Sequence, residues 1–139
     1  MPTWPELQQY VRGKYKLAED TDNLFSIVWA YDDGRLQKIR VLKFTAFDQE
    51  WISMSSAVCT ENELQPRVAL QRNSEFAIGS FALVSQGKDD KGQDQPQLYI
   101  LTYKLPLKSM DPEEFELPLR VLARTADELE KVYSGRDKF

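Results

Sequence analysis

The spacing of apolar residues follows the helical repeat at both ends of the chain. Trp4, Leu7 and Val11 recur at intervals of three and four, which predicts a helix that starts after Thr3 and ends at Gly13. A longer stripe runs from Phe115 to Tyr133 with the same spacing. Asp111-Pro-Glu-Glu114 precedes it with a capping side chain, a proline at the first helical position and acidic residues in the first turn. The chain is therefore expected to begin and end in amphipathic helices.

Between these helices the pattern is that of strands. Segments rich in β-branched and aromatic residues alternate with turn residues, such as Asp32-Asp33-Gly34, which predicts antiparallel hairpins. A short helix is expected to start at Pro66 and to end near Asn73. The predicted strands are residues 24–31, 36–47, 51–59, 76–85 and 97–107. The expected fold class is α+β with the order α-β-β-β-α-β-β-α, an antiparallel five-strand sheet with helices packed mainly on one face.

The chain length of 139 residues is that of one domain. Residues 86–97 are polar and contain glycine, which predicts a mobile hairpin loop, and residues 134–139 are expected to be a frayed tail. We therefore expect a single α+β domain over residues 1–139 with variation confined to these two segments.

The first two predicted strands are apolar on both faces. Phe25, Ile27 and Trp29 alternate with Leu24 and Val28, and the next strand repeats this arrangement. A sheet with one solvated face usually alternates more cleanly between apolar and polar residues. Either a second copy or a partner covers the second face, or the short helix and the loops fold over it.

The residue types argue against a catalytic or metal site. The chain has no histidine, which excludes Ser-His and Cys-His nucleophile pairs and histidine-based metal shells. The single cysteine, Cys59, lies in an apparent strand and is interpreted as a small core residue. The paired carboxylates Asp32/Asp33, Asp89/Asp90 and Glu113/Glu114 are explained by a turn, a solvated loop and a helix N-terminus. We expect no enzymatic activity, no metal and no cofactor.

Charge and hydropathy limit the kinds of partner that the sequence predicts. The net charge is −4, whereas nucleic-acid binding usually needs a basic excess, and the cations at Arg35, Lys38, Arg40 and Lys43 are interpreted as solvated strand charges. The N-terminus lacks the features of a signal peptide, and the apolar runs are shorter than the roughly 20 residues of a membrane-spanning helix. We expect a cytoplasmic protein that binds neither nucleic acid nor membrane.

Four segments carry a resemblance to a known family: Ala69–Asn73, Ile78–Leu83, Tyr103–Leu107 and Arg124–Leu129. With the order of elements, they resemble the type III secretion chaperone-like superfamily and, within it, the YbjN-type bacterial proteins. The resemblance implies a small acidic homodimer without enzymatic activity. It also implies that a partner segment lies along the first helix and exposed sheet surface, with the short helix near the dimer seam. The YbjN-type members imply a regulatory or accessory role.

The candidate site residues follow from these expectations. A protein-interaction module binding a peptide segment or protein partner is the first hypothesis, and aromatic and apolar side chains dominate such interfaces. The candidates for partner binding are Trp29, Tyr31, Phe44, Leu7 and Val11, and those for the dimer seam are Val68 and Leu70. The alternative is a small-ligand sensor with a pocket between the sheet and the closing helix.

Overall fold

A computed structural model describes residues 3–135, so part of the predicted tail, residues 136–139, lies outside the described residues. Its helices are α1 (Trp4–Lys14), α2 (Pro66–Asn73) and α3 (Pro112–Tyr133). Its strands are β1 (Leu17–Asp20), β2 (Leu24–Ala30), β3 (Leu36–Ala46), β4 (Gln49–Thr60), β5 (Ser80–Val84) and β6 (Leu98–Pro106). The predicted helices and the five predicted strands are all present.

The sheet has six strands rather than the predicted five, in the order β1-β2-β3-β4-β6-β5. All neighbouring strands are antiparallel. The strand missing from the prediction is β1, which pairs with β2 at the edge through a bulged register. Its four residues, Leu-Ala-Glu-Asp, include no β-branched or aromatic side chain, so the local pattern gave no strand signal.

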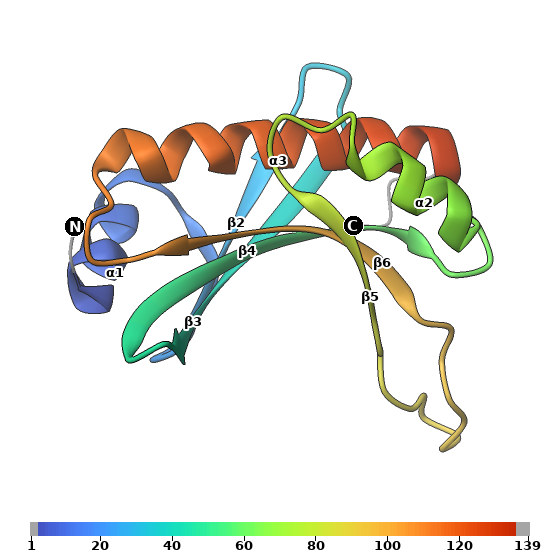
Figure 1. Ribbon diagram of the computed structural model, residues 1–139, viewed down its shortest axis with the longest axis horizontal. Helices are drawn as coiled ribbons and strands as arrows, with labels where there is room; N and C mark the ends of the chain where they lie inside the picture. Colours follow the sequence, from blue (N-terminus) through green and yellow to red (C-terminus); the bar gives the residue numbers. More distant parts are fainter. Residues whose placement is uncertain (1–2, 136–139) are drawn as a thin grey trace.

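Helix α3 covers one face of the sheet, and α1 and α2 flank it on the same side (Figure 1). Its N-terminus carries the predicted capping box, in which the Asp111 side chain accepts from the Glu114 backbone N–H and Glu114 reaches back. The buried stripe of α3 packs on β3, β4 and β6. At the centre of this core, Phe115, Leu119 and Leu122 are fully buried, together with Phe25 of β2. The prediction that the helices gather mainly on one face is confirmed.

A buried ion cluster fixes the far end of α3 to the turn between β2 and β3. Arg35 Nε lies 2.9 Å from Asp127 Oδ1, and Arg35 Nη2 lies 3.1 Å from Glu130 Oε1. Both carboxylates are buried, and Lys131 adds a contact of 2.8 Å to Asp33 in the same turn. The β2–β3 turn and the last turns of α3 are thus joined by charge as well as by packing.

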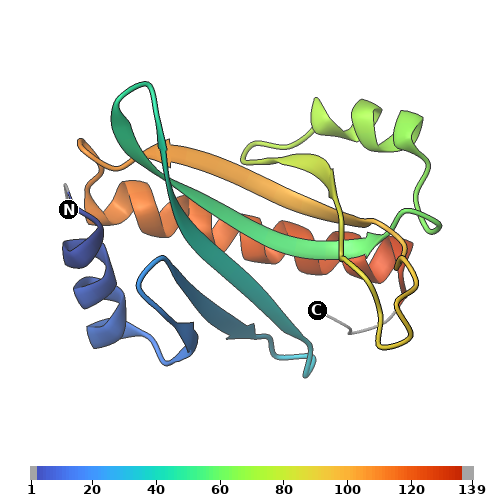
Figure 2. The same cartoon turned by 90° about the horizontal axis from the view of Figure 1, so that it is seen from below.

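The opposite face of the sheet is not covered by a helix within residues 3–135. Seen from that side, the strands lie in front of α3, while α1 and α2 stand beside the sheet (Figure 2). The β3–β4 turn and the β5–β6 loop project from the sheet on this side, away from α3 (Figure 1). We call this surface the open face.

Candidate partner-binding surface

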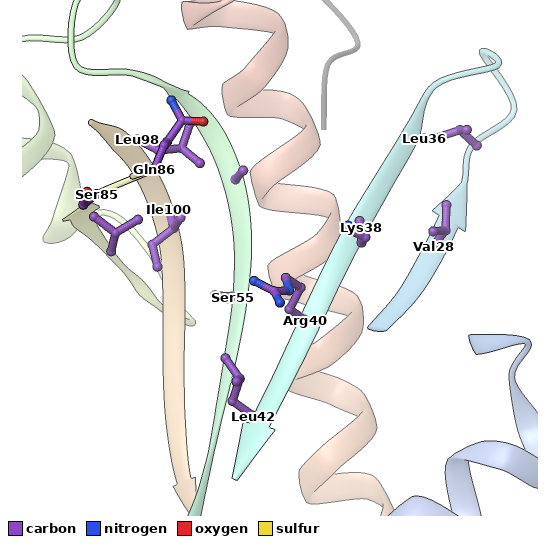
Figure 3. A pocket seen from close by; sticks show the side chains of 12 residues that line it. Val28, Leu36, Lys38, Arg40, Leu42, Ser55, Ser85, Gln86, Leu98 and Ile100 are labelled. Carbon is purple, nitrogen blue, oxygen red and sulfur yellow. The ribbon is translucent and has the colours of Figure 1, made fainter. Parts of the chain in front are cut away.

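A groove runs over the open face with a volume of about 780 Å³. Figure 3 shows side chains from β2, β3, β4 and β6 pointing into it, with Ser85 and Gln86 at one end. Three of its apolar side chains are well exposed for leucine and valine: Val28 by 42%, Leu36 by 47% and Leu42 by 37%. Half-buried apolar residues complete its floor: Ala57, Val84, Leu98 and Ile100. An apolar surface of this kind, left uncovered in one chain, is typical of an interaction site.

Two cations stand within this apolar floor. Lys38 and Arg40 project from β3 between Leu36 and Leu42, and their side chains are 45% and 47% exposed. Glu19 of β1 approaches both, with Oε1 at 3.5 Å from Lys38 Nζ and 3.4 Å from Arg40 Nε. Burial raises the pKa of Glu19, but the nearby Ser26 hydroxyl, Arg40 and Lys38 outweigh it and hold the pKa below its usual value. The carboxylate is therefore ionised at neutral pH and offsets one of the two cations.

An aromatic cluster lies at the end of the open face, beside the β3–β4 turn. The rings of Phe44 and Trp51 stack with centroids 6.2 Å apart, and Lys104 Nζ stands 5.7 Å from the Phe44 ring centroid. The turn places Phe47 and Asp48 at φ of 52° and 57°. The Phe47 side chain is 89% exposed. A bulky residue in this left-handed region is uncommon, and such strained, exposed aromatics are found at binding surfaces.

The structure separates the predicted partner-binding residues. Phe44 lies on the open face. Trp29 lies on the helical side, half-buried, with its ring 5.6 Å from that of Tyr15. Leu7 and Val11 are fully buried between α1 and the sheet, so in this conformation neither presents a surface to a partner. A binding role for these two side chains would require α1 to leave the sheet.

Tyr31 follows β2 on the helical side, near the last turns of α3. The Arg124 guanidinium lies 5.5 Å from the Tyr31 ring centroid, and burial raises the pKa of the Tyr31 hydroxyl to about 12. This side chain is therefore half-buried against α3 rather than part of the groove. The two predicted seam residues differ as well, because Val68 packs against the core whereas Leu70 is 71% exposed.

The sequence predicts a second apolar face on the first two strands, but it does not identify the groove residues as a binding site. Leu24, Val28 and Leu42 alternate with the core side chains of β2 and β3, and this alternation is the sequence signal for their face.

The region between the sheet and α3, where the sensor alternative expected a pocket, is filled by the buried side chains of Phe25, Phe115 and Leu122. In the described part of the chain, no group of three or more His, Cys, Asp or Glu side chains is placed to hold a metal, and no helix is long and apolar enough to cross a bilayer.

Helix α1 is held against α3 by a polar contact around the buried carboxylate of Glu116. The Glu116 carboxylate accepts hydrogen bonds from the Lys14 ammonium at 2.6 Å and from the Tyr10 and Tyr15 hydroxyls. Burial raises the pKa of Glu116, but the hydrogen bonds from Lys14 and Tyr10 prevail and lower it below its usual 4.5. The ionised carboxylate is therefore the form that the fold stabilises.

We expect the free energy of unfolding to fall in acid as Glu116 is protonated. Because its folded pKa lies below its unfolded pKa, its contribution is present above about pH 4.5 and is lost as the pH falls through the folded value. Urea titrations at a series of pH values measure this dependence. Glu116→Gln should lower the stability at neutral pH and flatten part of the acid slope, and an unchanged slope would contradict the assignment.

Comparison with known proteins gives the fold but no close relative. No family model and no curated protein matches the chain. A chain in the crystal structure of the ExsC–ExsE complex matches with a TM-score of 0.58 and 13% identity, covering 96% of this chain and 97% of that one. A chain in the structure of the HopA1–SchA chaperone–effector complex matches with a TM-score of 0.55 and 12% identity, covering 90% of both. The chain therefore shares the fold of these two chains. At these identities the likeness concerns the fold alone, and it confirms the fold that the sequence resemblance implied.

Proposed function

We propose that this protein is a non-enzymatic, chaperone-like interaction module that binds a peptide segment or protein partner on the open face of its sheet. The carrying observation is the groove itself, an apolar floor that no described helix or loop of the chain covers. Apolar side chains this exposed are stabilised when a partner removes them from water, by about 25 cal/mol per Å² buried. The fold supports the proposal, because one solved structure that shares it is a chaperone–effector complex.

The protein acts as a homodimer in this proposal, with α2 at the seam. Leu70 of α2 and Leu83 of the neighbouring edge strand β5 are 71% and 41% exposed, on the side of the molecule away from α1. Self-association through this edge leaves the open face free for the partner. A cytoplasmic location and a regulatory or accessory role like that of the YbjN-type bacterial proteins complete the proposal.

The proposal predicts that two negative charges introduced on the open face weaken partner binding. The double variant Leu36→Glu/Leu42→Glu places carboxylates where apolar side chains of a partner would be buried, which should weaken binding about tenfold or more. Both residues are exposed, so the circular dichroism spectrum and melting temperature should stay close to those of the wild type. The measurement is quantitative capture of partners from native extract on immobilised wild-type and variant chains.

Leu70→Glu provides the matched control, because it makes the same chemical change outside the groove. It should leave partner capture intact while light scattering shows a loss of dimer. A partner captured equally by the wild type and by the Leu36→Glu/Leu42→Glu chain would contradict binding on the open face.

A further inference from the structure

The register of the sheet aligns a polar residue from every strand into one row across the open face. The cross-strand pairs are Glu19 with Ser26, Ser26 with Arg40, Arg40 with Ser55, Ser55 with Thr102, and Thr102 with Ser80. The strands that contribute them are far apart in sequence, so the row exists only in the folded sheet. It consists of hydroxyl groups around one guanidinium, with one carboxylate at its β1 end.

Apolar residues lie on both sides of this polar row. Toward the β2–β3 turn the next positions include Val28, Ala57 and Ile100, interrupted on β3 by Lys38. Toward the β3–β4 turn the pair Leu24 and Leu42 comes next, followed across the sheet by Ser53 and Lys104. A segment bound over β2 and β3 therefore meets apolar side chains at Val28 and at Leu42, with the polar row between them.

The cations of the groove retain unused capacity to bind an anion. Among the residues that the structure describes, no side chain or carbonyl accepts a hydrogen bond from the Arg40 guanidinium, whose only ion-pair partner there is Glu19 at 3.4 Å. Lys38 likewise has Glu19 as its only ion-pair partner in that range. A guanidinium presents five N–H donors and matches a carboxylate in two-pronged geometry. With one carboxylate beside two cations, the groove keeps an excess of one positive charge in a protein whose net charge is −4.

We infer that the segment bound on the open face carries a carboxylate side chain that pairs with Arg40, flanked by apolar side chains that cover Val28, Leu42 and Ile100. The inference rests on the proposed function and adds the chemistry of the partner. An acidic group there pairs with the second of the two cations, whereas a neutral segment would bury both with Glu19 as their one shared carboxylate among the described residues.

A second copy of this chain fits the groove less well. In a face-to-face dimer about a two-fold axis through the groove, the Lys38 and Arg40 side chains of one copy would approach those of the other. Like charges brought together in an interface oppose association. The cations thus disfavour self-association through this face and favour an acidic partner.

The test is a selection of random 12-residue peptides by mRNA display on the immobilised, full-length chain. Four chains are compared: wild type, Lys38→Gln/Arg40→Gln, the blocked Leu36→Glu/Leu42→Glu, and Lys108→Gln, which removes an exposed cation outside the groove. Sequencing gives the Asp and Glu content of the enriched peptides. Fluorescence anisotropy then compares an enriched peptide with its Glu→Gln counterpart on each chain.

Peptides enriched on the wild type and on Lys108→Gln should combine apolar residues with Asp or Glu, and the acidic preference should vanish on Lys38→Gln/Arg40→Gln. The Glu peptide should bind the wild type about threefold to tenfold more tightly than its Gln counterpart, as a half-exposed ion pair allows, and added salt should reduce this ratio.

Three results would overturn the inference in distinguishable ways. Enrichment of apolar peptides without acidic residues, or the same acidic content on Lys38→Gln/Arg40→Gln, refutes the carboxylate while leaving partner binding intact. No enrichment on the wild type over the blocked chain refutes the proposed function together with the inference. Self-association of the wild type that Leu36→Glu/Leu42→Glu abolishes in light scattering would show that a second copy covers the face.

Discussion

Replacing Arg35 by methionine is expected to lower the free energy of unfolding by about 3–5 kcal/mol. Arg35 is the cation between two buried carboxylates, at 2.9 Å from Asp127 and 3.1 Å from Glu130. Its side chain is itself only 16% exposed. Methionine fills much of the same volume but removes the positive charge that faces both buried carboxylates, while Lys131 Nζ remains 3.7 Å from Asp127 Oδ2. The loss should exceed that of an ordinary surface ion pair because water cannot replace the lost partner.

Arg12→Met is the matched control for this effect. Arg12 also contacts one carboxylate with two nitrogens, Nε and Nη2, each 2.8 Å from an Asp20 oxygen. This pair is exposed, with 52% and 33% of the two side chains accessible, so water replaces the lost partner and the loss of stability should be small. Urea denaturation of both variants at neutral pH gives the comparison.

A rescue variant separates charge from packing. Adding Asp127→Asn and Glu130→Gln to Arg35→Met removes the two buried negative charges that faced Arg35 and should recover a large part of the stability. If Arg35→Met costs no more than Arg12→Met, or if the neutralised triple variant stays as unstable as the single one, the ion cluster does not hold α3 to the β2–β3 turn.

Local sequence signals predicted most of the fold because most elements have a marked beginning. The capping box at Asp111, the proline at Pro66 and the glycine of the Asp32-Asp33-Gly34 turn each fix an element boundary within a few residues. Strand β1 was not predicted because a short edge strand needs few apolar residues. Its pairing with β2 also includes a bulge, for which the sequence has no signal. Apolar alternation also divided β2 and β3 correctly into their two faces.

The candidate site was harder to predict because long-range packing decides which face is covered. Trp29 and Phe44 look equally suited to an interface in the sequence, yet one lies against the helical layer and the other on the open face. Leu7 and Val11 became core because α1 packs its apolar stripe on the sheet. In the ion cluster, Arg35 lies 92 positions before Asp127 and 95 positions before Glu130 in the sequence. No local sequence pattern predicts a contact over such a separation.

The requirement for glycine at position 79 also follows only from the three-dimensional structure. It precedes β5 with φ of +87°, a conformation that costs other residues about 1–2 kcal/mol. A Cβ at this position would lie 2.8 Å from Leu122 Cδ1 and 3.2 Å from the Thr102 carbonyl oxygen. Leu122 is fully buried in α3, and Thr102 belongs to the strand that pairs with β5, so neither can move freely.

Gly79→Ala is therefore expected to destabilise the fold by about 2–5 kcal/mol, the sum of backbone strain and overpacking. Gly34→Ala separates the two contributions, because Gly34 has nearly the same φ, +84°, but a methyl group added there would meet no atom within 4 Å. That control should lose only the strain, about 1–2 kcal/mol. Urea denaturation of the two variants measures the difference, and equal losses would contradict the close approach of Gly79 to Leu122 and Thr102. A larger loss at Gly79 would show that the chain entering β5, the edge strand that carries Val84 of the groove, leaves no room for a side chain against α3 and β6.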